Sequence, residues 1–111
     1  MILINTTFCV DATIGNDFIT FVRDTYIPLA QDSGLHSLLL TEMREREDDQ
    51  QQEQAPTRTF ALQMRAPSQD AINDFANDVL PRIYEYIGKT WGQRVIPFES
   101  MLDVLVDSNK K

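Results

Sequence analysis

The chain has 111 residues, which suit one domain with one modest hydrophobic core and leave no room for a separate catalytic domain. It carries 17 acidic against 10 basic residues, so its formal net charge is -7. The phosphate backbone of a nucleic acid or an anionic lipid surface would repel this charge at long range. We therefore expect neither a nucleic-acid partner nor a membrane partner.

The first residues lack the basic start of a secretory signal peptide. Three polar residues at 5–7 interrupt the opening apolar run long before it reaches the length that crosses a bilayer. We expect a soluble, cytoplasmic protein. The single cysteine, Cys9, lies in this alternating run, where a small, buried and reduced thiol is the ordinary expectation.

Residues 2–10 alternate between apolar and mixed positions, a pattern that predicts a strand. An apolar stripe with helical spacing follows over residues 14–22, and Thr13 is the expected N-cap of that helix. Pro28 lacks a backbone donor and should end or kink this helix. Gly34 should end the helical segment as a whole.

The middle of the chain predicts a hairpin. Residues 37–47 begin apolar and become charged, which is typical of an edge strand. Residues 48–56 are polar and rich in glutamine, so we expect a mobile hairpin tip there. Residues 57–66 alternate again and mirror the first strand, so these two strands should lie side by side.

The last third predicts a second helix and a final strand. Ser68 is the expected N-cap, the apolar stripe over 72–87 keeps helical spacing, and Pro81 should produce a kink or divide the segment into two helices in line. Residues 95–106 read as a strand that contains Pro97, which favours an edge position.

The order of elements is therefore β-α-β-β-α-β. This order predicts an α+β, ferredoxin-like sandwich: a four-stranded antiparallel sheet with two helices on one face. We expect one such domain over residues 1–111, with a frayed tail at 108–111.

Two helices cover only one face of such a sheet, so the second face determines the partners. On the central strands this face is too polar for a dry core and less charged than an ordinary surface. Its residues are Leu3, Asn5, Thr7, Cys9, Thr59, Ala61 and Gln63. The last strand adds either Val95 and Met101 or Ile96, Phe98 and Leu102, depending on how Pro97 shifts the register. We expect a homodimer whose sheets face each other over roughly 800 Å² per partner, and the alternative is a monomer with one solvated face.

Several short motifs resemble one bacterial family. They are Asn5-Thr6-Thr7, Tyr26-Ile27-Pro28, Ser33-Gly34-Leu35, Phe60-Ala61-Leu62-Gln63, and residues 92–98 with Met101-Leu102. The chain resembles domain-of-unknown-function family four-two-eight-six, within the dimeric α/β-barrel group. The resemblance spans most of the chain and implies the fold and dimerisation. The wider group includes cofactor-independent antibiotic-biosynthesis-type monooxygenases, haem-degrading enzymes, small isomerases and non-catalytic relatives, so the chemistry stays open.

The sequence contains no metal-ligand cluster, phosphate loop or nucleophile motif, so we expect no metal and no cofactor and assign no catalytic residue. The candidates for binding a small apolar ligand are Asn5, Tyr26 and Trp91. Asn5 carries an amide that must find partners within a central strand, although a structural hydrogen bond to a neighbouring strand or across the dimer is the more common explanation. Tyr26 and Trp91 could line a pocket between helices and sheet, although aromatic residues there are usually core or rim.

Two functions from different classes remain. The sequence favours a homodimeric module that is non-catalytic or binds a small ligand, because no acid, base or metal constellation converges. The alternative is a cofactor-independent monooxygenase-like or isomerase-like enzyme that acts on a small aromatic substrate, with Asn5, Tyr26 or Trp91 in its pocket. An enclosed cavity of roughly 300 Å³ or more that at least two of these side chains reach would favour the enzyme.

Overall fold

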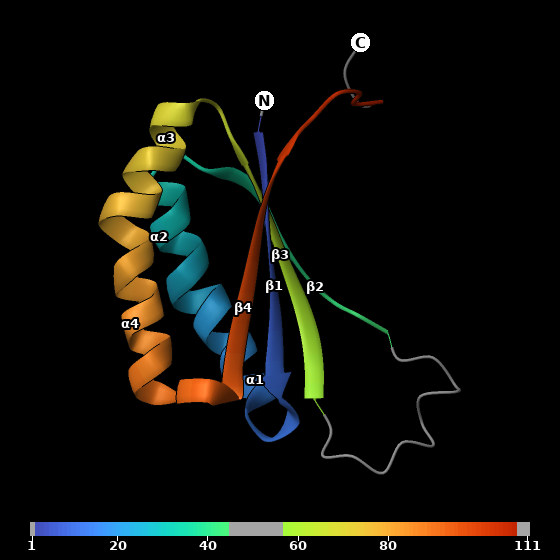
Figure 1. Cartoon of the computed structure of the whole chain (residues 1–111), viewed down its shortest axis with the longest axis vertical. Helices are drawn as coiled ribbons and strands as arrows, with labels where there is room; N and C mark the ends of the chain where they lie inside the picture. Colours follow the sequence, from blue (N-terminus) through green and yellow to red (C-terminus); the bar gives the residue numbers. More distant parts are fainter. Residues whose placement is uncertain (1, 45–56, 109–111) are drawn as a thin grey trace.

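The computed structural model describes residues 2–44 and 57–108. Four strands in this part form one sheet in the order β2-β3-β1-β4, and every neighbouring pair is antiparallel. The strands are β1 (Ile2–Asp11), β2 (His36–Glu42), β3 (Thr57–Ala66) and β4 (Val95–Asp103). The helices form a second layer on one face of the sheet (Figure 1). The predicted ferredoxin-like sandwich is confirmed.

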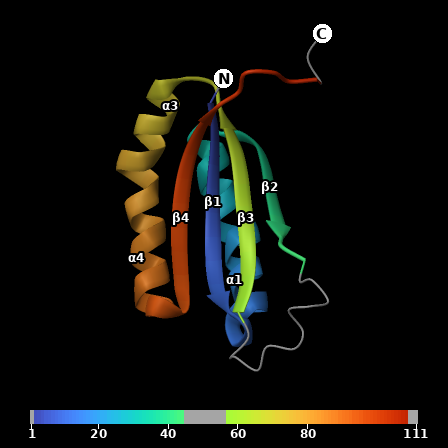
Figure 2. The same ribbon diagram turned by 45° about the vertical axis from the view of Figure 1, so that its right-hand side comes forward.

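The central pair consists of β1 and β3, which run antiparallel from the pair Ile2–Ala66 to the pair Asp11–Thr57. The matching alternation of apolar residues in the two segments predicted that these strands are neighbours, and the structure confirms it. The two strands expected at the edges, β2 and β4, do lie at the edges (Figure 2). Pro97 lies on β4 opposite Phe8, so the missing backbone donor falls on an edge strand, where a sheet tolerates it.

Two strand ends differ from the prediction. Strand β2 ends at Glu42 rather than at residue 47. The last strand ends at Asp103 rather than at residue 106, and residues 104–108 lie outside the sheet. Asp107 there pairs with Arg65 of β3, with 2.8 Å between Oδ2 and Nη1. The predicted hairpin tip at 48–56 lies outside the described residues, as do residues 109–111 of the predicted tail.

The first helical segment begins with a different cap from the one predicted. A 3-10 turn, η1 (Ala12–Ile14), separates β1 from helix α1 (Gly15–Phe21). The prediction of Thr13 as N-cap is wrong, because Thr13 lies inside this turn. Asp11 caps the turn: its carboxylate accepts hydrogen bonds from the Thr13 backbone nitrogen at 2.9 Å and from the Thr13 hydroxyl at 2.6 Å. These bonds from Thr13 hold the pKa of Asp11 below its usual value.

The segment then passes through a π-helical turn, η2 (Val22–Tyr26), into helix α2 (Ile27–Asp32). The Ile27 backbone nitrogen donates to the Val22 carbonyl five residues back, immediately before Pro28. The predicted change at Pro28 is therefore a widened turn, and the chain stays helical. Gly34 has a φ of 93°, and Leu35 donates to the Ala30 carbonyl at 3.1 Å, so the predicted stop is confirmed.

The second helical segment repeats this arrangement. Ser68 caps helix α3 (Gln69–Asp74) by accepting a hydrogen bond from the Ala71 nitrogen, as predicted. A π-helical turn, η4 (Phe75–Val79), leads into helix α4 (Leu80–Thr90), with Pro81 near its start. Two helices in line thus meet near Pro81. None of the helices in the described ranges is long and apolar enough to cross a membrane.

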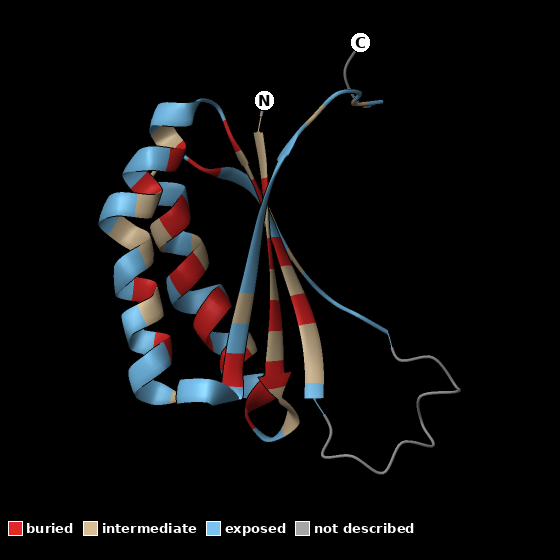
Figure 3. Ribbon diagram, in the orientation of Figure 1, coloured by how far each residue is buried: buried red, intermediate tan, exposed pale blue. Residues whose placement is uncertain are grey.

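The core lies between the helices and one face of the sheet (Figure 3). It takes the even-numbered side chains of β1 and β3 and the apolar stripes of both helical segments. The strands contribute Ile4, Phe8, Val10, Phe60, Leu62, Met64 and Ala66. Thr6 occupies a position in this otherwise apolar row and is fully buried.

Candidate functional site

The structure places the three candidate ligand-binding residues at three different positions. Asn5 lies on the sheet face away from the helices, because it alternates with the buried residues Ile4 and Thr6. Tyr26 lies in the core between helices and sheet, with none of its surface exposed. Trp91 lies at the end of α4 and is partly exposed.

The face around Asn5, called the open face below, is defined by the strand register. Thr59, Ala61 and Gln63 of β3 lie opposite Cys9, Thr7 and Asn5, respectively. On its other side β1 pairs with β4, which resolves the register left open by Pro97. Ile96, Phe98, Ser100 and Leu102 share the open face, whereas Val95 is buried on the helix side.

The two edge strands carry large apolar side chains on the open face. Leu39 of β2 is 55% exposed, and Met43, just beyond its end, is 68% exposed. On β4, Phe98 is 58% exposed, and Ile96 and Leu102 are each 47% exposed. The open face therefore has apolar margins on either side of a centre of small and polar side chains.

Asn5 makes its hydrogen bond within its own strand. Its Nδ2 atom donates to the Thr7 hydroxyl at 3.5 Å, a long contact. Gln63 and Ser100 lie opposite Asn5 on the neighbouring strands, so three side chains with polar ends form one row across the open face. This row can hydrogen-bond with a surface that covers it.

Tyr26 belongs to a cluster of buried hydroxyl groups. The hydroxyls of Tyr26, Tyr84 and Thr6 are buried, and none has a hydrogen-bond partner within the described part of the chain. Thr6 lies close enough to Tyr26 to lower its pKa slightly, but their geometry falls short of a hydrogen bond. Burial is the larger effect and raises the pKa of both phenols far above the usual value. Both phenols therefore stay neutral over the physiological range.

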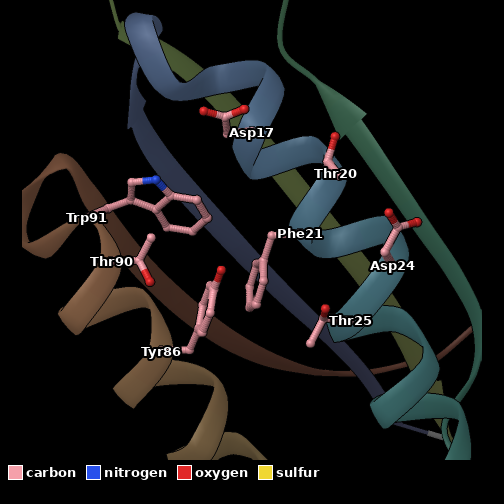
Figure 4. Close-up of a pocket in the computed structure, with 8 residues that line it drawn as sticks. All are labelled: Asp17, Thr20, Phe21, Asp24, Thr25, Tyr86, Thr90 and Trp91. Atoms are coloured by element: carbon pink, nitrogen blue, oxygen red, sulfur yellow. The ribbon is translucent and has the colours of Figure 1, made fainter.

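Trp91 lines a surface groove with a volume of about 460 Å³. The groove lies between the α1–η2 segment and the end of α4 (Figure 4). Its lining residues are Asp17, Thr20, Phe21, Asp24 and Thr25 from the first segment, and Tyr86, Thr90 and Trp91 from the second. Neither Asn5 nor Tyr26 reaches it.

Three aromatic rings form one wall of the groove. Phe21 and Tyr86 are stacked, with centroids 4.7 Å apart and an interplanar angle of 4°. Trp91 meets both rings nearly at right angles, at 5.6 Å from Phe21 and 5.9 Å from Tyr86. Phe21 also contacts Tyr26 at 6.5 Å, so the groove is the outer edge of the aromatic core.

Sequence reasoning missed two parts of this arrangement. Tyr86 falls outside the apolar stripe of its helix, so the pattern gave it no role. Thr6 did carry a signal, because it is a hydroxyl residue at a core position of β1, between Ile4 and Phe8. Within residues 2–44 and 57–108, no three His, Cys, Asp or Glu side chains are placed to share a metal ion.

Comparison with solved structures finds the same fold in proteins of very different sequence. A candidate antibiotic biosynthesis monooxygenase from Deinococcus radiodurans superposes with a TM-score of 0.65 at 11% identity, over 98% of this chain and 97% of that one. The heme-degrader MhuD from Mycobacterium tuberculosis, solved with two hemes in its active site, gives 0.60 at 15% identity, over 96% and 98%. A dimeric ferredoxin-like protein from an uncultured marine organism gives 0.57 at 9% identity, over 96% of each chain.

At these identities the similarity establishes the fold and leaves the activity open. No match was found among curated proteins. The model of the family described as domain of unknown function DUF4286 matches residues 1–105, which confirms the resemblance carried by the short motifs. The chain belongs to the DUF4286 family.

Proposed function

We propose that this protein acts as a homodimeric module that covers the open face of its sheet with a second copy, and that its role is binding rather than catalysis. The observation that carries the proposal is the open face itself. Its margins expose five large apolar side chains, listed here from one edge to the other: Leu39, Met43, Leu102, Phe98 and Ile96. Large apolar side chains that gather in this way on one exposed face, here in two groups at its margins, are typical of an interface.

The charge of the face also fits a second copy. Between the row of Leu3 and the row of Cys9, the described strands place one residue that is charged at neutral pH, Arg65, on this face. Its guanidinium pairs with Asp107, whose side chain is only 11% exposed. The molecule as a whole carries a net charge of -7, so two copies repel each other, and this repulsion costs least when they meet at a face of low charge.

Solved structures with a similar fold support the proposed homodimer. Two of the similar structures come from proteins described as dimeric and ferredoxin-like. Others are described as candidate monooxygenases or as a heme-degrader, so the fold is compatible with catalysis in those proteins.

Binding is favoured over catalysis by the separation of the candidate side chains. The enzyme alternative would be favoured by at least two of Asn5, Tyr26 and Trp91 in one enclosed cavity. Trp91 lines an open groove, Tyr26 is buried in the core and Asn5 lies on the opposite face of the sheet. Within the described residues, these groups cannot act together on one substrate.

The mass in solution tests the pairing. Light scattering at micromolar concentration should give twice the 12.8 kDa mass of the chain. Phe98→Glu places a charge on the open face and should give the mass of one chain, because burying an unpaired charge is costly.

Met101→Glu is the matched control. Met101 lies on the same strand and is 60% exposed, close to the 58% of Phe98, but it lies opposite Ile4 and belongs to the other face of the sheet. This variant should keep the doubled mass. A wild-type protein with the mass of one chain, or equal effects of the two substitutions, would overturn pairing through the open face.

A further inference from the structure

We propose that the groove beside Trp91 binds an organic cation, a quaternary ammonium group or a similar methylated amine. The inference names a ligand class for the binding role proposed above and rests on that role, but it does not depend on the pairing of the sheets. It also changes the ligand expected from the sequence, because the groove that Trp91 lines is not purely apolar.

The aromatic rings supply the first part of the recognition. The groove wall combines a stacked pair, Phe21 and Tyr86, with the nearly perpendicular ring of Trp91. These three rings contact one another and Phe21 is only 6% exposed, so the ring surface left for a ligand belongs to Tyr86 and Trp91. Ring faces carry negative electrostatic potential and attract quaternary ammonium groups. Tyr86 is 49% exposed, so an apolar cation that entered the groove would cover ring surface that water now contacts.

The charges supply the second part. Both charged residues that line the groove, Asp17 and Asp24, are acidic, and the other polar lining residues are three threonines. Asp24 forms an ion pair with Arg23 at 2.9 Å, but both side chains are mostly exposed, so the pair is weak. Asp17 forms no ion pair with any residue of the described ranges, so its charge is available to a ligand.

The end of helix α4 adds to this field. The helix runs for 11 residues and ends at Thr90, which lines the groove. The carbonyl end of a helix carries partial negative charge and stabilises cations nearby. Aromatic faces, carboxylates and the helix end therefore favour the same sign of ligand charge, so a neutral or anionic ligand of the same shape should bind less well.

Trp91 provides the readout, because it is the only tryptophan in the chain. Choline chloride is the probe, and 3,3-dimethylbutan-1-ol, which has the same shape without the charge, is its matched control. Choline should change the Trp91 emission saturably, with half-saturation at about 1 mM or a few times higher. The alcohol should bind at least about fivefold more weakly, and sodium chloride at equal ionic strength should give no saturable change.

Two substitutions locate the site. Asp17→Asn and Tyr86→Leu should each weaken choline binding about two- to fivefold, through the lost carboxylate and the lost ring face respectively. Asp78→Asn, which removes an exposed carboxylate from η4 outside the groove, should leave binding unchanged. Circular dichroism verifies that each variant is folded.

The proposal fails if choline produces no saturable change, if the alcohol binds as tightly as choline, or if Asp17→Asn has no more effect than Asp78→Asn. Light scattering on the same samples separates the two ideas. If the protein is a monomer that binds choline, the proposed dimer is wrong and the proposed cation site stands. If it is a dimer that does not bind choline, the cation site is wrong and the dimer stands.

Discussion

At the scale of single residues, the core between helices and sheet contains buried hydroxyl groups. Tyr26, Tyr84 and Thr6 bring three hydroxyl groups into this space without partners among the described residues. A buried hydroxyl without a partner costs about 1 to 3 kcal/mol, so an apolar core would be more stable here. The tyrosine rings themselves fill the core well: Tyr26 meets Phe8 edge-on at 6.3 Å and Phe21 at 6.5 Å.

The Tyr26 phenol should make stability depend on alkaline pH. An unfolded tyrosine loses its proton near its ordinary pKa of 10.0, whereas burial keeps Tyr26 protonated in the folded state well above that value. Above about pH 10 the unfolded chain therefore binds fewer protons than the folded one, and the free energy of unfolding falls by up to about 1.4 kcal/mol per pH unit.

Tyr26→Phe removes this contribution. Urea unfolding between about pH 9 and about pH 11 should thus show wild-type stability falling more steeply than that of the variant. Below about pH 9 the difference between the two proteins should be constant, because the phenol is protonated in both states. Parallel pH profiles throughout would mean that the Tyr26 hydroxyl reaches solvent or a base.

At the scale of elements, both helical segments accommodate a proline in the same way. Each has a five-residue π-helical turn, η2 or η4, whose last residue lies two positions before Pro28 or Pro81, respectively. The sequence predicted a disturbance at each proline, because the missing donor and the ring clash are local properties. The widened turn was not predictable from local rules. Tyr26 of η2 packs against Phe75 of η4 at 6.3 Å, and that contact exists only after both segments lie on the sheet.

Ser68 tests an element boundary that the sequence did predict. Its hydroxyl accepts a hydrogen bond from the Ala71 nitrogen at 3.2 Å and caps α3. Ser68→Ala should lower the free energy of unfolding by about 1 kcal/mol, measured by chemical denaturation. Ser68→Thr keeps a hydroxyl and should retain most of the stability. If the two variants lose equal stability, the hydroxyl is not the stabilising group.

At the scale of the whole molecule, the sequence predicted the strand order and the two faces better than it predicted a site. Alternation alone assigned Asn5 to the face away from the helices. Tyr26 and Trp91 both belong to the helical layer, and no periodicity separates a tyrosine packed over Thr6 from a tryptophan that reaches the surface. The groove also depends on the stacking of Tyr86 on Phe21, two residues far apart in the chain. Such a site arises from packing between segments.

The thiol of Cys9 offers a test of the assembled molecule that is independent of mass. Cys9 is the only cysteine, and it lies partly exposed on the open face between Thr59 and Ile96. In a dimer joined through this face the thiol is covered, so a disulfide-exchange reagent in excess should modify it only after dissociation. The wild-type rate constant should therefore fall as protein concentration rises.

The Phe98→Glu variant distinguishes this protection from slow reaction within one chain. As a monomer it should react faster than the wild type, at a rate constant that does not change with protein concentration. Met101→Glu should behave like the wild type, because its substitution lies on the other face. If the wild-type rate constant is also independent of concentration while light scattering gives the doubled mass, the copies meet through a different surface. The apolar margins of the sheet would then face solvent in the dimer.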